Sequence, residues 1–503
     1  MTIKPGLVFR VDAGTQMGTG HVMRCLALAQ AWQDASGAAH FAAVELPEGL
    51  ATRLAAEGMV LHRLEVVPGS HDDAAQTAAL AHSLGATWVV EDGYHFGADY
   101  QLAIKEAGLR LLAVDDYGHA THYTADLVLN QNVYADGSFY PSRESYTQLL
   151  LGTQYVLLRR EFWPWRGWQR DIPEVARNIL VTMGGGDPDN QTAKVLRAIQ
   201  QADLGEPEVT IVVGAGNPHF HELQCAAQEA PFTTRIARNV SNMPDLMARA
   251  DVAISAAGST CWELAFMGLP NLVLILAGNQ ARVAAKLDAV GAALNLGWSS
   301  ELSSLEVAQA LRELLNAAGQ RAAIAQHGRD LVDGEGARRV ADQIQKQGLS
   351  FRRAQMEDCD LLWEWANEPV VRAASFSPGP IRWEEHVAWF TSRLADPNHI
   401  FYLALVGATG IGQIRYQLEG QKATVSVSLA SPWRSRGYGS EVIRQASRQI
   451  FETTDTKRIV AYIKPENVAS VQAFVRAGFR HKRATTIHGQ RALCFVLERE
   501  PLP

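Results

Sequence analysis

Residues 9–32 read FRVDAGTQMGTGHVMRCLALAQAW and pass from an apolar run through a glycine-rich loop into an amphipathic segment. Val22, Leu26 and Ala29 recur at helical spacing, so we expect a helix that starts near Gly20. A strand that leads through a short loop into a helix is the repeating unit of parallel α/β sheets. The stretch therefore predicts an α/β fold for the part of the chain that it opens.

The alternation of apolar runs and Ala-rich amphipathic segments continues to about residue 347. It restarts near Asn178, after a connection at residues 163–174 that contains tryptophan, arginine and two prolines. We expect two Rossmann-like halves, at residues 1–165 and 175–347, each with a parallel sheet covered on both faces. Ligands of such sheets bind beyond the carboxyl ends of the strands, so a cleft between the halves is the expected site.

The last third of the chain has a different character. Residues 351–368 read FRRAQMEDCDLLWEWANE, which suggests a short strand followed by a Trp-rich helix. Runs of strand-like composition follow at residues 401–407, 411–418 and 423–430. This order predicts an α+β domain at residues 349–503, built around a sheet that is mostly antiparallel.

The composition of the 503 residues is that of a soluble globular protein, with 47% hydrophobic and 20% charged residues. A net charge of -7 without blocks of like charge argues against nucleic acid or an anionic membrane as partner. The five cysteines are scattered and never form a CxxC pair, so we expect a reducing compartment and no metal site. With neither a signal peptide nor an apolar run of membrane-spanning length, the expected location is the cytoplasm.

The first glycine loop contains Gly18 and Gly20, which let a ligand approach the backbone closely. The spacing of these glycines alone fits two interpretations equally well: a loop that binds a ligand and a loop that only helps the helix to pack. His21 follows at the predicted helix start, where the positive end of the helix disfavours an imidazolium and leaves a neutral base. A capping or surface histidine is the alternative interpretation.

Two further glycine loops precede predicted helices in the second half. One contains Gly184, Gly185 and Gly186, followed by Asp187, and can present backbone N–H groups to a diphosphate. The other contains Gly258, Ser259 and Thr260, with Glu263 one turn into the helix. That glutamate either binds ligand or belongs to a capping box, because both patterns place an acidic residue there.

A fourth loop lies in the last domain, where residues 434–439 read RSRGYG after an apolar strand and before a helix. Its N–H groups can hold a pyrophosphate, and two arginines add positive charge. The segment ENVASVQAFVRAGFR follows at residues 466–480. Together, the two segments resemble the coenzyme A site of the GNAT acetyltransferases. The resemblance implies that acetyl-CoA is bound by Arg434, Arg436, Gly437, Tyr438, Gly439, Ser440, Asn467 and Ser470.

Residues 5–345 resemble the hydrolases that release UDP from UDP-2,4-diacetamido-2,4,6-trideoxy-altrose, and related spore-coat polysaccharide proteins. The resemblance implies a two-lobed glycosyltransferase-B fold and a UDP-sugar substrate. It implies that His21 is the general base, that Asp12 orients the substrate or the histidine, and that Glu263 receives the ribose hydroxyls. It also implies that Asn279 and Gln280 contact sugar or phosphate, and that the segment with Asn239 lies against uracil.

Residues 349–499 resemble the GNAT acetyltransferases, and the segment at residues 363–390 resembles their amino-sugar branch. One departure concerns Phe474, which stands where that family commonly has a tyrosine that protonates the thiolate. Together, the resemblances imply 4-N-acetylation of a UDP-4-amino sugar followed by hydrolysis, as in pseudaminic acid synthesis for flagellin glycosylation. The alternatives are a glycosyltransferase of the same fold and a sugar-nucleotide binding module with an inactive acetyltransferase domain.

Overall fold

The computed structural model describes residues 6–14, 18–214, 216–238, 240–406 and 409–499. The chain divides into two compact units, Met1–Ala341 and Asp342–Pro503. The predicted limits of the three domains stay predictions.

Strands β1–β7 form the first sheet, in the spatial order β3-β2-β1-β4-β5-β6-β7, and their neighbouring pairs are parallel. The residues of β1 and β4 are buried, as expected for strands covered on both faces. The elements are β1 (Gly6–Val11), α1 (Gly20–Asp34), β2 (Ala38–Ala43), α2 (Glu48–Ala56), β3 (Val60–Arg63), α3 (His71–Ser83), β4 (Trp88–Asp92), α4 (Ala98–Glu106), β5 (Arg110–Val114), β6 (Leu127–Asn130), η1 (Gly137–Phe139), β7 (Gln148–Leu151), η2 (Thr153–Tyr155) and η3 (Arg160–Trp165).

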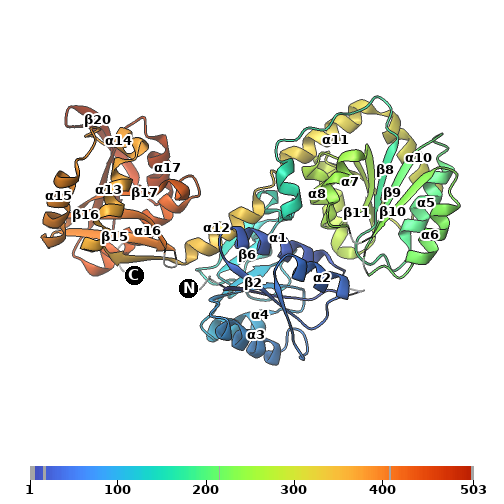
Figure 1. Ribbon diagram of the computed structural model, residues 1–503, viewed down its shortest axis with the longest axis horizontal. Coiled ribbons are helices and arrows are strands. Elements are labelled where there is room, and N and C mark those ends of the chain that lie inside the picture. Colours follow the sequence, from blue (N-terminus) through green and yellow to red (C-terminus); the bar gives the residue numbers. More distant parts are fainter. Residues whose placement is uncertain (1–5, 15–17, 215, 239, 407–408, 500–503) are drawn as a thin grey trace. The chain divides into compact units, whose positions relative to one another are not determined.

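Strands β8–β13 form a second parallel sheet, in the order β10-β9-β8-β11-β12-β13. Helices α5, α6 and α10 cover one face with one apolar core, and α7 and α8 cover the other with a second core (Figure 1). The elements are β8 (Asn178–Thr182), α5 (Gln191–Gln201), β9 (Glu208–Val213), α6 (Phe220–Gln228), β10 (Thr233–Arg238), α7 (Met243–Arg249), β11 (Val252–Ala256), α8 (Thr260–Phe266), β12 (Asn271–Ile275), η4 (Gly278–Gln280), α9 (Ala281–Ala289), β13 (Leu294–Trp298), α10 (Ser304–Asn316), α11 (Ala318–Leu331) and α12 (Gly336–Gln347).

The second unit contains a third sheet, in the order β14-β15-β16-β17-β18-β20-β19. Its pairs are antiparallel except for β17 with β18, which run parallel. The elements are β14 (Leu349–Arg353), η5 (Met356–Asp358), α13 (Cys359–Asn367), α14 (Pro369–Ala374), α15 (Trp383–Ala395), β15 (His399–Val406), β16 (Thr409–Glu419), β17 (Lys422–Leu429), η6 (Ser431–Trp433), α16 (Tyr438–Thr453), β18 (Arg458–Ile463), α17 (Val468–Arg476), β19 (Arg480–Ile487) and β20 (Gln490–Glu498).

Two apolar cores lie on opposite faces of this third sheet. Tyr402 and Ala404 of β15 belong to the core under α16 and α17, whereas Phe401 and Leu403 belong to the core under α13 and α15. This division follows from the strand geometry, because successive side chains point to opposite faces. The chain therefore has the predicted parallel sheets, followed by the predicted antiparallel-rich sheet.

Candidate active site

A cavity of about 730 Å³ lies within the first unit, lined by loops that follow the strands of both parallel sheets. These loops follow β1, β4 and β5 in the first sheet and β8, β11 and β12 in the second. The carboxyl ends of parallel strands meet at one edge of a sheet, which explains why the loops converge. The predicted residues that line this cavity are Gly18, Gly20, His21, Gly184, Gly185, Gly186, Asp187, Gly258, Ser259, Thr260, Glu263, Asn279 and Gln280.

His21 stands in the first turn of α1, and its ring is mostly buried. Its Nδ1 lies 2.5 Å from Oδ1 of Asp92, at the end of β4. An ionised carboxylate can only accept a hydrogen bond, so this contact places the ring proton on Nδ1. The lone pair of Nε2 is then available, which is what a general base requires.

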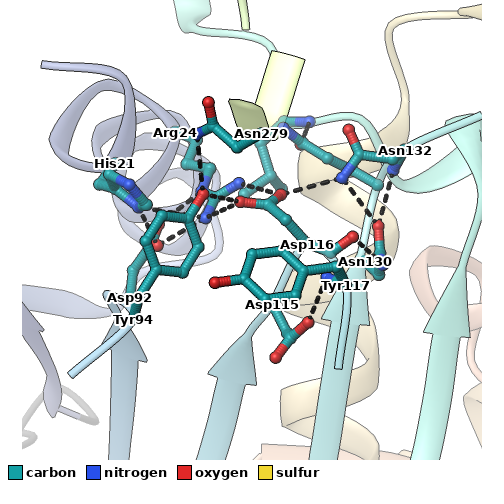
Figure 2. Close-up of polar contacts among 12 residues, drawn as sticks. His21, Arg24, Asp92, Tyr94, Asp115, Asp116, Tyr117, Asn130, Asn132 and Asn279 are labelled. Carbon is teal, nitrogen blue, oxygen red and sulfur yellow. Dashed lines mark hydrogen bonds and ion pairs between the residues drawn. The ribbon is translucent and has the colours of Figure 1, made fainter. Parts of the chain in front are cut away.

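Asp92 is part of a larger network around Arg24, which lies one turn after His21 on the same helix (Figure 2). Arg24 donates from Nε and Nη2 to the two oxygens of Asp92, both at 2.6 Å, and from Nη1 to Asp116 at 2.8 Å. Burial acts to raise the pKa of both carboxyls, but Arg24 and His21 hold these pKa values below the ordinary range. Both carboxylates therefore stay ionised, and Asp92 remains an acceptor for His21.

Tyr94 and Asn279 connect this network to the loop after β12 (Figure 2). The Tyr94 hydroxyl donates to Oδ2 of Asp116 at 2.8 Å, and Asn279 Nδ2 donates to the same hydroxyl at 3.3 Å. Asn132 donates to the other oxygen of Asp116 at 2.9 Å. Gln280, in contrast, accepts from the backbone N–H of Leu276 at 3.0 Å and so stabilises the turn that carries Asn279.

Asp12 makes no hydrogen bond to His21, so of its two predicted roles only that toward the substrate stays a prediction. Its Oδ2 accepts from Arg10 at 2.6 Å, and its Oδ1 accepts from the N–H groups of Val44 and Glu45. The carboxylate that contacts His21 belongs to Asp92. The order of a Rossmann-like sheet could have suggested this residue, because such sheets place the fourth strand beside the first.

In the loop after β8, the backbone rather than the side chain of Asp187 is available to a ligand. Gly184 has φ +88° and Asp187 has φ +44°, so the chain adopts the left-handed region at the first glycine of the run and at the residue after the run. The Asp187 carboxylate accepts from the N–H groups of Gln191 and Thr192, at 2.7 and 2.9 Å, and thus stabilises the start of α5. A Cβ on Gly185 would overlap the side chain of Thr19, so the loop needs a glycine there.

Glu263 lies in α8, which follows Gly258. A Cβ added to Gly258 would point into open space. Its Oε1 is 3.0 Å from Nη2 of Arg159, which also bonds Glu161. Burial raises the pKa of the Glu263 carboxyl to about 7, although Arg159 acts in the opposite direction. Ser259, which precedes α8, makes no side-chain cap within the described chain. Whether Glu263 binds ligand or belongs to a capping box stays a prediction. Asn239 lies outside the described residues.

The predicted acetyl-CoA residues form the start of two helices in the second unit. Gly437 has φ +80° and directly precedes α16, and Ser440 donates to its carbonyl at 3.0 Å. Asn467 accepts from the N–H of Ser470 at 3.1 Å and caps α17. The first N–H groups of α16, which include Gly439, have no partner within the helix.

The two arginines of this loop already have partners. Nη2 of Arg434 lies 2.5 Å from Oε2 of Glu368, and Arg436 forms an ion pair with Asp342. The electrostatic attraction of the loop for a pyrophosphate is therefore weaker than the sequence predicts. The backbone N–H groups of the loop remain the main donors that it can present to an anion.

Neither aromatic residue near this loop is placed to donate a proton to a thiolate. Phe474 is buried in the core and meets Phe479 edge to face at 5.0 Å. The buried Tyr438 hydroxyl donates to Oε1 of Gln345 at 2.9 Å, and burial raises its pKa. The position of the family's usual acid is thus filled by an apolar side chain.

Residues 349–480 match the family model of the acetyltransferase (GNAT) domain, and residues 178–344 match that of the glycosyltransferase family 28 C-terminal domain. The chain joins glycosyltransferase-B-like halves to a GNAT domain. The predicted fold class is thereby confirmed. In the described parts of the chain, no helix is long and apolar enough to cross a membrane, and no cluster of His, Cys, Asp and Glu could hold a metal ion.

An uncharacterized protein of Methanocaldococcus jannaschii is 22% identical over 494 residues, which are 93% of this chain and 95% of that protein. A spore coat polysaccharide biosynthesis protein of Bacillus subtilis is 29% identical over 253 residues, 50% of this chain and 74% of its own. A UDP-2,4-diacetamido-2,4,6-trideoxy-beta-L-altropyranose hydrolase of Campylobacter jejuni is 26% identical over 222 residues, which are 43% of this chain and 73% of that protein. The expected resemblance to a UDP-sugar hydrolase fused to a GNAT domain is thus confirmed.

Proposed function

We propose that the chain is a bifunctional sugar-nucleotide enzyme of pseudaminic acid synthesis. The GNAT domain transfers an acetyl group from acetyl-CoA to the 4-amino group of a UDP-4-amino-4,6-dideoxy sugar. The first unit then releases UDP from UDP-2,4-diacetamido-2,4,6-trideoxy-beta-L-altropyranose by hydrolysis. The similarity to the Campylobacter hydrolase and the match to the GNAT model support this pairing.

The observation that carries the hydrolase is the His21–Asp92 pair in a cavity lined by three glycine loops. Nε2 of His21 takes a proton from a water molecule, whose oxygen attacks the anomeric carbon on the face opposite UDP. The bond from that carbon to the phosphate oxygen breaks, and UDP leaves with the electron pair. The configuration at the anomeric carbon is inverted.

The departing diphosphate gains negative charge, and backbone N–H groups after β8 and β11 are available to stabilise it. Glu263 is our candidate for the ribose hydroxyls, because a carboxylate accepts two neighbouring hydroxyl hydrogen bonds well. Asp92 stabilises the imidazolium that forms on His21, and Arg24 keeps Asp92 ionised. Each charge that the reaction creates thus has a partner.

In the acetyltransferase half, the free amine attacks the thioester carbonyl, and the sulfur leaves as a thiolate. The proton lost by the amine goes to solvent, and solvent protonates the thiolate, because Phe474 has no proton and Tyr438 donates to Gln345. This route differs from the side-chain acid implied by the GNAT resemblance.

The second candidate is a UDP-sugar glycosyltransferase, which the match to the glycosyltransferase family 28 model favours. A carbohydrate hydroxyl would then replace water as the nucleophile beside His21. A binding module with an inactive GNAT domain is the non-enzymatic alternative. These alternatives predict different behaviour when a UDP-sugar is the only substrate.

The test is incubation with the UDP-diacetamido sugar in ¹⁸O water, followed by mass spectrometry. The hydrolase releases UDP without an acceptor and places one ¹⁸O atom in the sugar, none in UDP. A glycosyltransferase shows no turnover until an acceptor is added, and a binding module shows none in either case. Either of the last two results would contradict the hydrolase.

A further inference from the structure

The C-terminal part of α12 packs against the glycine loop that precedes α16. Helix α12 comprises Gly336–Gln347, and the second unit begins within it, at Asp342. The match to the GNAT family model starts only at residue 349. The end of α12 therefore belongs to the same compact unit as the GNAT segment, although it lies before the matched residues.

Two polar contacts fasten this part of the helix to the loop. Arg436 donates from Nε and Nη2 to the two carboxylate oxygens of Asp342, which is buried. The buried Tyr438 hydroxyl donates to Oε1 of Gln345 at 2.9 Å. Residues three and four positions apart share one face of a helix, so Lys346 lies on the same face as Asp342.

Lys346 brings a positive charge to the loop. Its Nζ lies 5.6 Å from the centre of the Tyr438 ring. A Cβ added to Gly437 would come within 2.9 Å of the same Nζ, so the ammonium group lies directly beside the backbone of that glycine. The Lys346 side chain is half-buried, which leaves it accessible to a ligand from solvent.

This charge complements what the loop itself provides. Arg434 is paired with Glu368, and Arg436 with Asp342, so carboxylates balance both guanidinium groups of the loop. The first N–H groups of α16 carry only partial positive charge. A pyrophosphate is negatively charged at both of its phosphorus centres, and a lysine beside backbone N–H groups is a common way to bind it.

We propose that Lys346 binds the pyrophosphate of acetyl-CoA, together with the first N–H groups of α16. The proposal rests on the acetyltransferase function and adds to its cofactor site a residue that precedes the GNAT-matched segment. Asp342 and Gln345 are positioning residues, because their bonds to Arg436 and Tyr438 hold α12 against the loop. The cation of this site thus comes from α12 rather than from the loop arginines.

The diphosphate of a UDP-sugar acceptor has the same chemistry, so the test separates the two sources. Lys346→Gln and Lys346→Arg are compared with Lys457→Gln, which removes an exposed lysine beyond the opposite end of α16. For each full-length variant, calorimetry gives the Kd of acetyl-CoA and of its 3′-dephospho form. Initial rates give the KM of the UDP-4-amino sugar, and kcat/KM for S-acetylpantetheine, a donor without the pyrophosphate.

Lys346→Gln is expected to weaken acetyl-CoA binding by about 5- to 20-fold, because it removes a charged donor from a partly exposed site. The 3′-dephospho form should lose the same factor. The KM of the acceptor and kcat/KM for S-acetylpantetheine should stay at the wild-type values. Lys346→Arg should retain most of the affinity, and Lys457→Gln should match the wild type throughout. The effect should also shrink as the salt concentration rises. An unchanged Tm will show that each variant is folded.

Four results would overturn the proposal. An unchanged Kd for acetyl-CoA in Lys346→Gln would show that Lys346 does not contact the cofactor. A raised KM for the acceptor, with the acetyl-CoA Kd unchanged, would assign Lys346 to the UDP diphosphate. A loss with acetyl-CoA but not with its 3′-dephospho form would assign it to the 3′-phosphate. An equal loss with S-acetylpantetheine would show that the substitution disturbs the loop instead. If the wild type binds no acetyl-CoA, the acetyltransferase function itself is wrong.

Discussion

His21 owes its proposed role to neighbours rather than to its place at a helix start. Asp92 fixes the proton on Nδ1, and Arg24 keeps Asp92 ionised within a buried environment. Arg24 also bonds Asp116, which in turn accepts from Tyr94. Removing any of these side chains should therefore lower the ability of His21 to act as a base, although the histidine itself is kept.

Changing His21 to alanine should abolish UDP release and leave acetyl transfer near the wild-type rate. General-base catalysis contributes about 10²–10⁴-fold, so a loss of that size is expected in kcat. The measurement is UDP release from the diacetamido sugar, with acetyl transfer in the same preparation as the control. Hydrolysis within about threefold of wild type would refute the assignment of His21 as base.

Replacing Asp92 with asparagine should lower the rate of hydrolysis by about 10- to 10³-fold, because an amide can hold His21 in the wrong tautomer. KM should change little, since Asp92 is not expected to touch the substrate. Asp72→Asn, at an exposed position on α3, is the matched control. If both variants hydrolyse equally fast, Asp92 has no part in activating His21.

The raised pKa of Glu263 predicts a pH dependence of UDP binding. Because ribose hydroxyls bond best to an ionised carboxylate, affinity should rise as the pH rises through about 7. Between pH 7 and pH 6 the Kd should increase by about fivefold. Without ligand the folded state holds this proton more tightly, so the group's contribution to stability is lost as the pH rises from 4.5 to about 7.

Calorimetry of UDP binding between pH 5.5 and pH 8.5 tests this expectation. Glu263→Gln should bind UDP more weakly and with little dependence on pH. A wild-type Kd that does not vary over the same range would show that Glu263 does not bind the nucleotide in its ionised form.

At the level of single elements, the starts of helices decide where ligands can bind. The loops before α1, α5, α8 and α16 follow strands and leave the first N–H groups of each helix without partners in the helix. Glycines in these loops allow left-handed turns and close approach, as at Gly184 and Gly437. In our proposal, the same local design thus serves a UDP-sugar in one unit and acetyl-CoA in the other.

Gly437→Glu should remove acetyl-CoA binding and leave hydrolysis unchanged. The substitution strains a residue at φ +80° and brings a carboxylate to the loop that would hold the pyrophosphate. Calorimetry should show at least about a tenfold weaker Kd for acetyl-CoA. Gly420→Glu, at φ +63° in the turn between β16 and β17, separates strain from lost binding. An unchanged Kd in Gly437→Glu would remove this loop from the cofactor site.

The sequence predicted elements better than it predicted the contacts between them. Apolar runs and glycine loops were sufficient to locate strands such as β4 and β8, and loops such as that before α8. The pairing of Asp92 with His21 depends on β4 lying beside β1, which no local pattern states. The partners of Arg434 and Arg436 are equally distant in the chain, so the loop looked more positive in sequence than it is in the fold.

At the scale of the whole molecule, our proposal gives one chain two consecutive reactions, in which the product of the acetyl transfer is the substrate of the hydrolysis. The 4-amino group is protonated at neutral pH, whereas the 4-acetamido group is neutral. A hydrolase cavity suited to the acetamido group would bury an ammonium without partners. Such mismatches cost about 1–3 kcal/mol for each unpaired group, and more when it is charged.

UDP release from the UDP-4-amino sugar should therefore depend on acetyl-CoA. Chromatography of UDP, with and without acetyl-CoA, measures the effect, and we expect at least about a tenfold difference. Gly437→Glu supplies the control. Because this variant should not bind acetyl-CoA, its UDP release from the UDP-4-amino sugar should stay low whether or not acetyl-CoA is added. Equal release in both conditions would show that the hydrolase ignores the 4-substituent.

Arg24 follows His21 by one turn, so a single helix supplies both the proposed base and the cation that keeps its carboxylate partner ionised. This arrangement has a consequence for enzyme engineering. To convert a related sugar transferase into a hydrolase, grafting a histidine onto its first helix would not be enough. The graft must include the arginine one turn later and acidic residues at the ends of two adjacent strands, because the four side chains form one transferable unit.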